Sequence, residues 1–146
     1  MRRLAGMFGA ALLIAFGAIA IIGRLGRSWE SRVAVEGHSM EPTLSDGDWL
    51  LVDPDAYRHR APRVAELVAA RDPRDASRVI IKRVTAIEAD GRLTLAGDHP
   101  AHAGDNVAIG PVDARAVLGR PWFRYWPTSR FGTVGSRDIW IRAPGA

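Results

Sequence analysis

Cysteine is absent from this chain of 146 residues, and lysine occurs only once. The lack of cysteine excludes disulfide bonds, thiolate nucleophiles and cysteine metal sites. Every strongly basic side chain except Lys82 is an arginine, so this lysine stands alone in "RVIIKRVTAIE", residues 78–88. Arginine stays protonated in proteins, whereas a buried lysine can lose its proton and act as a base. The single lysine therefore raises the question of which residue is its partner.

Charged residues are also missing between Leu4 and Gly23. A helix of this length would be about 30 Å long, enough to cross the hydrocarbon core of a bilayer. A removable signal peptide is the alternative, but the residues after Gly23 are basic and bulky rather than small. We therefore expect a retained single-pass membrane anchor at residues 4–23, followed by a polar connector at residues 24–31. Arginines flank both ends, so charge does not fix its orientation.

Short apolar runs separated by Gly, Pro and Asp follow the connector, and they predict strands. Asp90-Gly91 predicts a hairpin, and residues 71–77 predict a turn-rich loop. The fold class is therefore mostly β: a transmembrane helix, then one β-rich domain at residues 32–127, then a loosely organised tail at residues 128–146. The expected strands are 32–35, 49–52, 66–70, 78–87, 92–96 and 116–126, with a last short strand at 138–142.

The net charge of +4 is spread along the chain without a basic run or a nucleic-acid motif, so no nucleic-acid partner is expected. Asp98, His99 and His102 lie close together, but no further ligand set accompanies them and Pro100 breaks helical spacing. We predict no metal site there. The aromatic run at residues 122–126 predicts either a belt at the lipid interface or core packing in the last strand of the domain.

Ser39 lies in "VEGHSMEPTLSDGDWLLVD", residues 35–53, between a strand-like run and a turn. Gly37 permits tight backbone geometry just before it, and Pro42 disfavours helix just after it. The serine is thus expected at the end of a strand on a constrained loop. Such a position suits a nucleophile, although it equally suits an ordinary β-turn. A serine nucleophile also needs a base. His38 is a poor candidate, because adjacent strand residues face opposite ways.

Lys82 lies in an apolar strand, where alternation places it on the same face as Ile80 and Val84 and places Arg83 on the other. A lysine in such a strand either extends to water or is retained for its reactivity. To act as a base, it must be neutral near the operating pH, so burial must lower its pKa from the ordinary value of about 10.4. Serine–lysine dyads are a known solution to serine activation.

The runs "GHSMEPTL", "GDWLLV", "IIKRV" and "LAGD" together closely resemble the signal peptidase I family (S26-type) of serine–lysine membrane peptidases. The resemblance implies a mostly β fold, with Ser39 as nucleophile, Lys82 as general base and the Ser39 amide in the oxyanion hole. It implies an extended substrate paired with strands Arg32–Val35 and Val79–Lys82, cut after small residues, without metal or organic cofactor. The expected supporting or substrate-binding residues are Gly37, His38, Met40, Pro42, Ile80, Ile81, Asp98, Asp105 and Asn106.

The third region of the family pattern is altered in "GDHPAHAGDNVAIGPV", residues 97–112. Ala103 occupies the position of the serine that orients the lysine in the family. Val107 replaces the arginine that would pair with Asp105, and Asn106 could supply a substitute hydrogen bond. These changes put the tuning of Lys82 in question more than the fold.

Three readings of the function follow from these motifs. The favoured one is a plasma-membrane endopeptidase that removes signal or leader peptides from exported proteins, with its catalytic domain on the extracytoplasmic side. A relative dedicated to maturing one protein, of the nickel superoxide dismutase type, is the second. The third is a non-catalytic, membrane-anchored module that binds extended peptides. The lipid bilayer and a preprotein substrate are the expected partners.

Overall fold

The computed structural model describes residues 2–99 and 109–134. Helix α1 (Arg2–Glu30) comes first, and the strands that follow form one antiparallel sheet, which confirms the mostly β fold. The strands are β1 (Arg32–Ala34), β2 (Trp49–Asp53), β3 (Leu67–Asp72), β4 (Asp75–Ile87), β5 (Leu93–Ala96), β6 (Ile109–Val112), β7 (Val117–Trp126) and β8 (Gly132–Thr133). Two short 3-10 helices, η1 (Ala114–Ala116) and η2 (Thr128–Arg130), flank β7.

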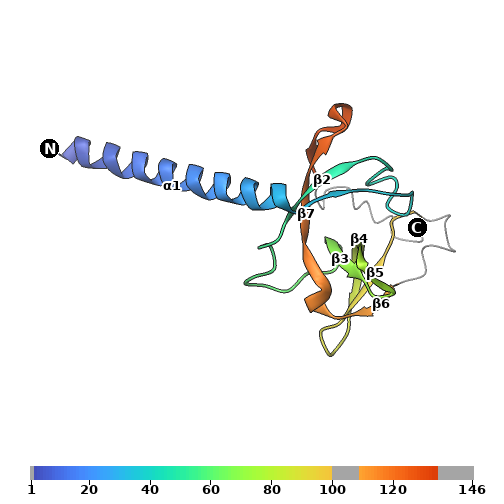
Figure 1. The fold of residues 1–146 in the computed structure, drawn as a ribbon. Coiled ribbons are helices and arrows are strands. Elements are labelled where there is room, and N and C mark those ends of the chain that lie inside the picture. Colours follow the sequence, from blue (N-terminus) through green and yellow to red (C-terminus); the bar gives the residue numbers. More distant parts are fainter. Residues whose placement is uncertain (1, 100–108, 135–146) are drawn as a thin grey trace, which may run out of the picture.

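Helix α1 projects from the β domain as a single long rod (Figure 1). It continues to Glu30, through the stretch where the sequence predicts a polar connector. Its last turns are held against the domain by side-chain contacts: Arg24 pairs with Asp53 at 2.9 Å, and Trp122 Nε1 donates a hydrogen bond to Ser28 Oγ at 3.2 Å. These contacts explain why the polar residues there form helix rather than a loose connection.

The transmembrane span expected at residues 4–23 finds no support in this structure. Within the part of the chain that it describes, no helix has the length and apolar character required to cross a bilayer. The side chains of residues 4–13 lie outside the described part. Further along α1, large apolar side chains are well exposed, among them Ile14 (73%), Phe16 (72%) and Ile22 (67%).

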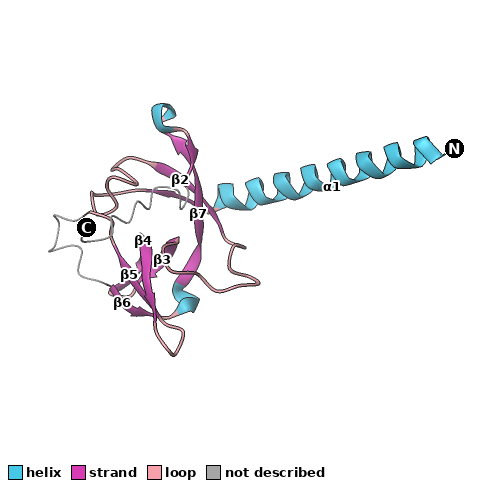
Figure 2. Ribbon diagram, turned by 180° about the vertical axis from the view of Figure 1, so that it is seen from behind, coloured by secondary structure: helices cyan, strands magenta, loops and turns pink. Residues whose placement is uncertain are grey.

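Strand β7 runs through the middle of the sheet, whose order is β1-β2-β7-β3-β4-β5-β6, with β8 also paired to β7 (Figure 2). Its C-terminal half pairs with β2 and its N-terminal half pairs with β3. Gly119 lies where these pairings meet, and a Cβ there would collide with the Asp53 carbonyl oxygen and approach Val52 Cγ1 to 2.8 Å. Only glycine lets β2 and β7 approach so closely at this point.

The sheet encloses two hydrophobic clusters, and β4 contributes to both. Ile81 belongs to the cluster with Met40, Leu44 and Leu50, whereas Ile80 belongs to the cluster with Val84. This division follows from strand alternation, because neighbouring side chains point to opposite faces. Lys82 therefore starts from the same face of β4 as Ile80 and Val84, as the sequence predicts.

Two of the predicted connections can be compared with the structure. The hairpin at Asp90-Gly91 is present, because β4 pairs with β5 and Gly91 adopts a φ of +83°. The turn-rich loop predicted at residues 71–77 is wrong in its extent: the turn comprises residues 73–74 only, because β3 continues to Asp72, β4 begins at Asp75, and these two residues pair. Asp72 accepts hydrogen bonds from the Arg74 backbone and guanidinium, which stabilises the short turn.

Beyond β7 the chain is ordered in the described part of the predicted tail, since β8 pairs with β7 and Val134 N donates to Trp122 O at 2.9 Å. The strand expected at residues 138–142 lies outside the described residues. The aromatic run of β7 belongs to neither core cluster. It covers the junction with α1, where the Tyr125 and Trp29 rings lie 5.3 Å apart, while Trp126 is 54% exposed.

Candidate active site

The loop between β1 and β2 carries Ser39 and is closed by backbone hydrogen bonds at its base. Val35 bonds to two successive residues at the other end of the loop: its N donates to Asp48 O at 2.8 Å, and its O accepts from Gly47 N at 3.0 Å. Gly37 takes a φ of +83° and donates its amide to Asp46 Oδ1 at 2.8 Å. Met40, directly after the serine, is buried at 2% exposure. The loop is therefore fixed on both sides of Ser39.

Lys82 approaches Ser39 from strand β4. Its Nζ atom donates a hydrogen bond to Ser39 Oγ at 2.8 Å, although the two residues are 43 positions apart in the sequence. Lys82 is 7% exposed, so the amine is almost fully removed from water. A separation of this size permits direct proton transfer between a hydroxyl and a neutral amine. Sequence reasoning predicts both residues as catalytic, and the fold brings them together.

Arg83, the next residue of β4, is held by a different set of groups. Its guanidinium makes two hydrogen bonds to the Asp98 carboxylate, with Nε to Oδ1 at 2.7 Å, and a third to Ala65 O at 2.8 Å. Thr43 Oγ1 donates to the same carboxylate at 2.6 Å. This cluster ties the Ser39 loop to β4 and to the end of β5, because Thr43, Arg83 and Asp98 come from these three segments.

The segment after β5 also reaches the serine loop through its backbone. His99 N donates to Ser39 O at 3.2 Å. The predicted supporting role of Asp98 therefore has a structural counterpart, which acts through Thr43 and Arg83. Neither of these two residues is anticipated from the sequence, which places Arg83 only on the face opposite Lys82. Asp105 and Asn106 lie outside the described residues, so their predicted roles stay predictions.

His38 precedes the serine and points into solvent, and its Nδ1 atom lies 2.9 Å from Glu41 Oε1. The hydrogen bond that the His38 ring donates to Glu41, together with the negative charge of that carboxylate, raises the pKa of His38 above its ordinary value of 6.5. The protonated form of His38 is thus favoured beside the Ser39–Lys82 pair.

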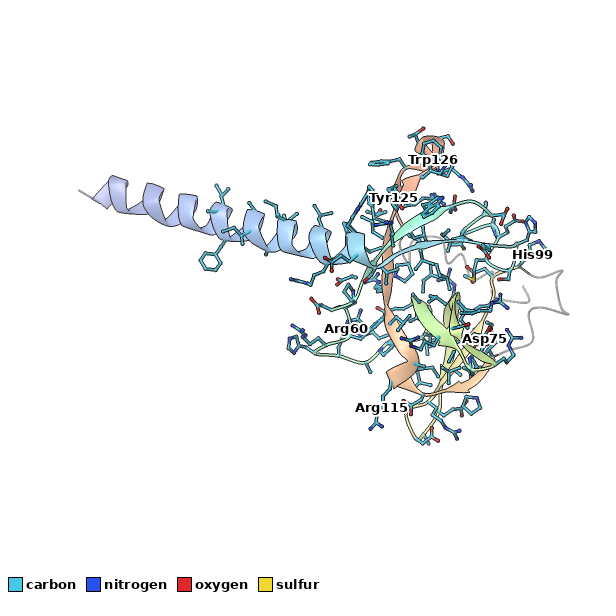
Figure 3. The ribbon with its side chains drawn as sticks, viewed as in Figure 1. Arg60, Asp75, His99, Arg115, Tyr125 and Trp126 are labelled. Atoms are coloured by element: carbon cyan, nitrogen blue, oxygen red, sulfur yellow. The ribbon has the colours of Figure 1, made fainter. Side chains whose placement is uncertain are left out.

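A cavity of about 710 Å³ contains the Ser39–Lys82 pair and lies between β1 with its following loop and β4. Most of the predicted supporting residues line it: Gly37, His38, Met40, Ile80 and Ile81. Pro42 is not among the described lining residues and is exposed. Its position limits it to shaping the loop. Figure 3 shows His99, whose amide bonds to the Ser39 loop, on the side of the β domain away from α1.

Comparisons with known proteins agree with this arrangement. Residues 6–91, which include both members of the pair, match the family model described as signal peptidase, peptidase S26. Mitochondrial inner membrane protease subunit 2 of Danio rerio is 34% identical over 121 residues, covering 68% of this chain and 66% of that protein. Mitochondrial ATP-independent inner membrane protease subunit 1a of Arabidopsis thaliana is 31% identical over 127 residues, covering 71% and 75% respectively.

A more distant similarity is to the probable signal peptidase I-1 of Synechocystis sp., which is 23% identical over 145 residues and covers 70% of this chain and 74% of that protein. The chain spans about two thirds of the Danio rerio protein and about three quarters of the other two. The family match extends over more than half of the chain. The chain belongs to the signal peptidase family, peptidase S26.

Proposed function

We propose that this protein is a serine endopeptidase in which Ser39 is the nucleophile and Lys82 is the general base. The observation that carries the proposal is the 2.8 Å contact between Lys82 Nζ and Ser39 Oγ inside the cavity. Burial disfavours the charged form of an amine. A neutral Lys82 can then accept the hydroxyl proton across the same contact.

The proposed reaction proceeds in two halves. Ser39 Oγ attacks the scissile carbonyl carbon while its proton passes to Lys82 Nζ, and the Ser39 amide stabilises the oxyanion. Collapse of this intermediate breaks the C–N bond, and Lys82 returns the proton to the departing amine. A water molecule then attacks the acyl ester, again giving its proton to Lys82, which passes it back to Ser39 Oγ. The net result is hydrolysis of one peptide bond.

The proposed substrate is the signal or leader peptide of an exported protein, bound extended between β1 and β4 and cut after small residues. Both walls of the cavity are short stretches of strand and loop, residues 33–40 and 78–82, to which an extended peptide can add backbone hydrogen bonds. Backbone pairing alone gives little sequence preference. Selection for small residues is therefore assigned to the apolar lining near the pair, such as Met40, Ile80 and Ile81.

Membrane attachment through α1 is part of the proposal. The uncharged run at residues 4–23 and the exposed apolar side chains of the described part of α1 support it, as do relatives named as inner membrane proteases. The proposed location is the plasma membrane, with a single pass and the β domain on the extracytoplasmic side. Flotation with lipid vesicles tests it: the full chain should rise with them, and a chain recovered only in the dense fraction would contradict attachment.

The catalytic proposal is tested with three full-length proteins in detergent: wild type, Ser39→Ala and Lys82→Arg. Each is incubated with a panel of preproteins, and cleavage sites are read by mass spectrometry. We expect only wild type to cut, after small residues, because arginine keeps the charge of Lys82 but cannot give up its proton. Cleavage by Lys82→Arg at the wild-type rate would refute the dyad. Cleavage of one preprotein only would identify a dedicated peptidase.

A further inference from the structure

The cavity extends along β4 beyond the Ser39–Lys82 pair, and arginines line it there. Arg74 and Arg78 are lining residues, together with Val79, Ile80 and Ile81. Among the described residues that line the cavity, the carboxylate is Glu36. It lies on the wall opposite β4, three residues before Ser39. The cavity lining thus combines the Ser39–Lys82 pair with two arginines that precede Lys82 on β4 or on the turn before it.

Arg78 and Arg74 differ in whether they already have acidic partners. The Arg74 guanidinium makes two hydrogen bonds of 3.0 Å to Asp72. Arg78 is exposed and, among the residues that the structure describes, forms no ion pair and no side-chain hydrogen bond. Asp75, a nearby acidic residue, accepts hydrogen bonds from the Ser77 hydroxyl and amide instead. Arg78 acts electrostatically on Asp72 and Asp75 but forms no ion pair with either in the described part of the chain, so its guanidinium can take an acidic partner in the cavity.

Strand geometry gives the distance from this charge to the reacting atoms. Arg78 precedes Lys82 by four residues on β4, and both line the cavity, although the pairing of β4 with β3 is irregular between Asp75 and Val79. At roughly 3.3 Å per residue, an extended strand places their Cα atoms at most about 13 Å apart. A peptide bound extended beside β4 advances by the same step. A substrate residue opposite Arg78 is thus about four positions from the residue opposite Lys82.

We propose that Arg78 is a specificity-determining residue that selects a carboxylate side chain in the bound peptide, four to six residues before the bond that is cut. The inference rests on the proposed function, because that function places the leader side of the substrate between β1 and β4. The peptide residue beside Lys82 is the first or second before the scissile bond, and the long arginine side chain reaches one position to either side. The partner is thus an acidic leader segment.

Peptide binding to full-length Ser39→Ala in detergent tests this without cleavage. Fluorescent peptides carry alanine at the first and third positions before the bond and Glu, Gln or Lys at the fifth, and Kd is measured by anisotropy. We expect Glu to bind about threefold to tenfold more tightly than Lys, the range of one exposed ion pair gained against one repulsion. The preference should largely disappear in 1 M salt. Moving Glu to the tenth position should abolish it.

Matched variants assign the effect to Arg78. In the Ser39→Ala background, Arg78→Glu should reverse the preference and Arg78→Gln should remove it. Arg115→Glu is the control, because Arg115 is also exposed and forms no ion pair among the described residues, yet lies on η1 outside the cavity lining (Figure 3). An unchanged Glu preference in Arg78→Glu, or an equal loss in Arg115→Glu, would overturn the inference. Thermal unfolding of each variant shows that its fold is kept.

A parallel assay with Ser39 intact separates failure of this inference from failure of the proposed function. If wild type cuts the neutral peptide but neither cuts nor binds the Glu peptide better, Arg78 has no role in selection and the peptidase proposal stands. If the Arg78-dependent preference is measured and no peptide is cut, Arg78 selects acidic peptides in binding, and the peptidase proposal falls together with the numbering of positions from a cut bond. If Ser39→Ala binds none of the peptides, the inference is overturned.

Discussion

Lys82 and Arg83 are neighbours on one strand, yet they serve opposite sides of β4 in different ways. Lys82 reaches a neutral hydroxyl, that of Ser39, at 2.8 Å. Arg83 reaches a carboxylate, that of Asp98, through two hydrogen bonds, and lies 3.4 Å from the Thr43 hydroxyl. Both therefore contact the loop between β1 and β2, one at Ser39 and the other at Thr43.

The two cations are not interchangeable, because their side chains have different chemistry. A guanidinium stays charged and matches a carboxylate with two parallel donors, which suits a permanent structural link. An amine can become neutral on burial and then accept a proton. Strand alternation keeps the two side chains apart, so the Lys82 amine is separated from the Asp98 carboxylate, whose charge would favour its protonated form.

Lys82→Met should abolish cleavage while leaving the fold intact. Loss of a general base typically lowers the rate by about 10²- to 10⁴-fold. Replacing a buried amine by an apolar chain of similar length is neutral or stabilising. The measurement pairs kcat/KM on a cleaved preprotein with the midpoint of thermal unfolding. If Lys82→Met lost activity only because it unfolded, Lys82 would have a structural role like that of Arg83, and the proposed difference between the two residues would be wrong.

Arg83→Met should show the reverse pattern, a large loss of stability. Removal of one partner from a buried ion pair costs about 3–5 kcal/mol, and here both side chains are 14% exposed, so we expect about 2–4 kcal/mol. Denaturant unfolding of the full chain measures it. The double variant Arg83→Met/Asp98→Leu should recover most of the loss, because no charge is then left unpaired. Additive losses in the double variant would contradict the pairing.

Thr43→Val removes only the hydroxyl that donates to Asp98, and keeps the shape of the side chain. We expect a cost of about 1 kcal/mol in the free energy of unfolding, the usual value for one hydrogen bond, somewhat more because the acceptor is charged. Thr85→Val is a suitable control, since the Thr85 hydroxyl bonds to a backbone carbonyl on the exposed side of β4. Equal losses of stability in both variants would show that the hydrogen bond from Thr43 to Asp98 stabilises the fold no more than the exposed one made by Thr85.

Glu41→Gln should lower the pKa of His38 towards its ordinary value of 6.5, because the hydrogen bond and charge of Glu41 raise it. A histidine whose pKa is higher in the folded state adds stability below its unfolded pKa and loses it as the pH rises through the folded pKa. The small stability gain at acidic pH should therefore vanish in the variant. NMR titration of the His38 ring measures the shift, and an unchanged pKa would contradict the assigned cause.

The sequence predicts those parts of this molecule that depend on local pattern. Alternation in residues 78–87 predicts β4, the face of Lys82 and the opposite face of Arg83, and the Gly37 and Pro42 positions predict a constrained loop at Ser39. The motif resemblance predicts that the loop and the strand meet. Each of these predictions depends on a short stretch of sequence or on a motif that resembles a known family.

The missed features depend on contacts between distant segments. Nothing local joins Arg83 to Asp98 and Thr43, because strand pairing decides which loops become neighbours. The end of α1 is also missed, since the helical conformation of its polar last turns is stabilised by Asp53 and Trp122 in strands far along the chain. The turn at Asp72–Asp75 is shorter than predicted because Arg74 caps it through its side chain.

The contacts at the end of α1 limit the distance between the Ser39–Lys82 pair and the N-terminal end of the helix. Its 29 residues make a rod of roughly 44 Å at about 1.5 Å per residue. Arg24 and Arg27 fasten that rod to Asp53 and Asp55, and Ser28 fastens it to Trp122, so the domain is not free to swing on a hinge. The position of Ser39 relative to the helix is therefore fixed, and in the proposed peptidase a substrate has to present its cleavable bond at that distance from the helix.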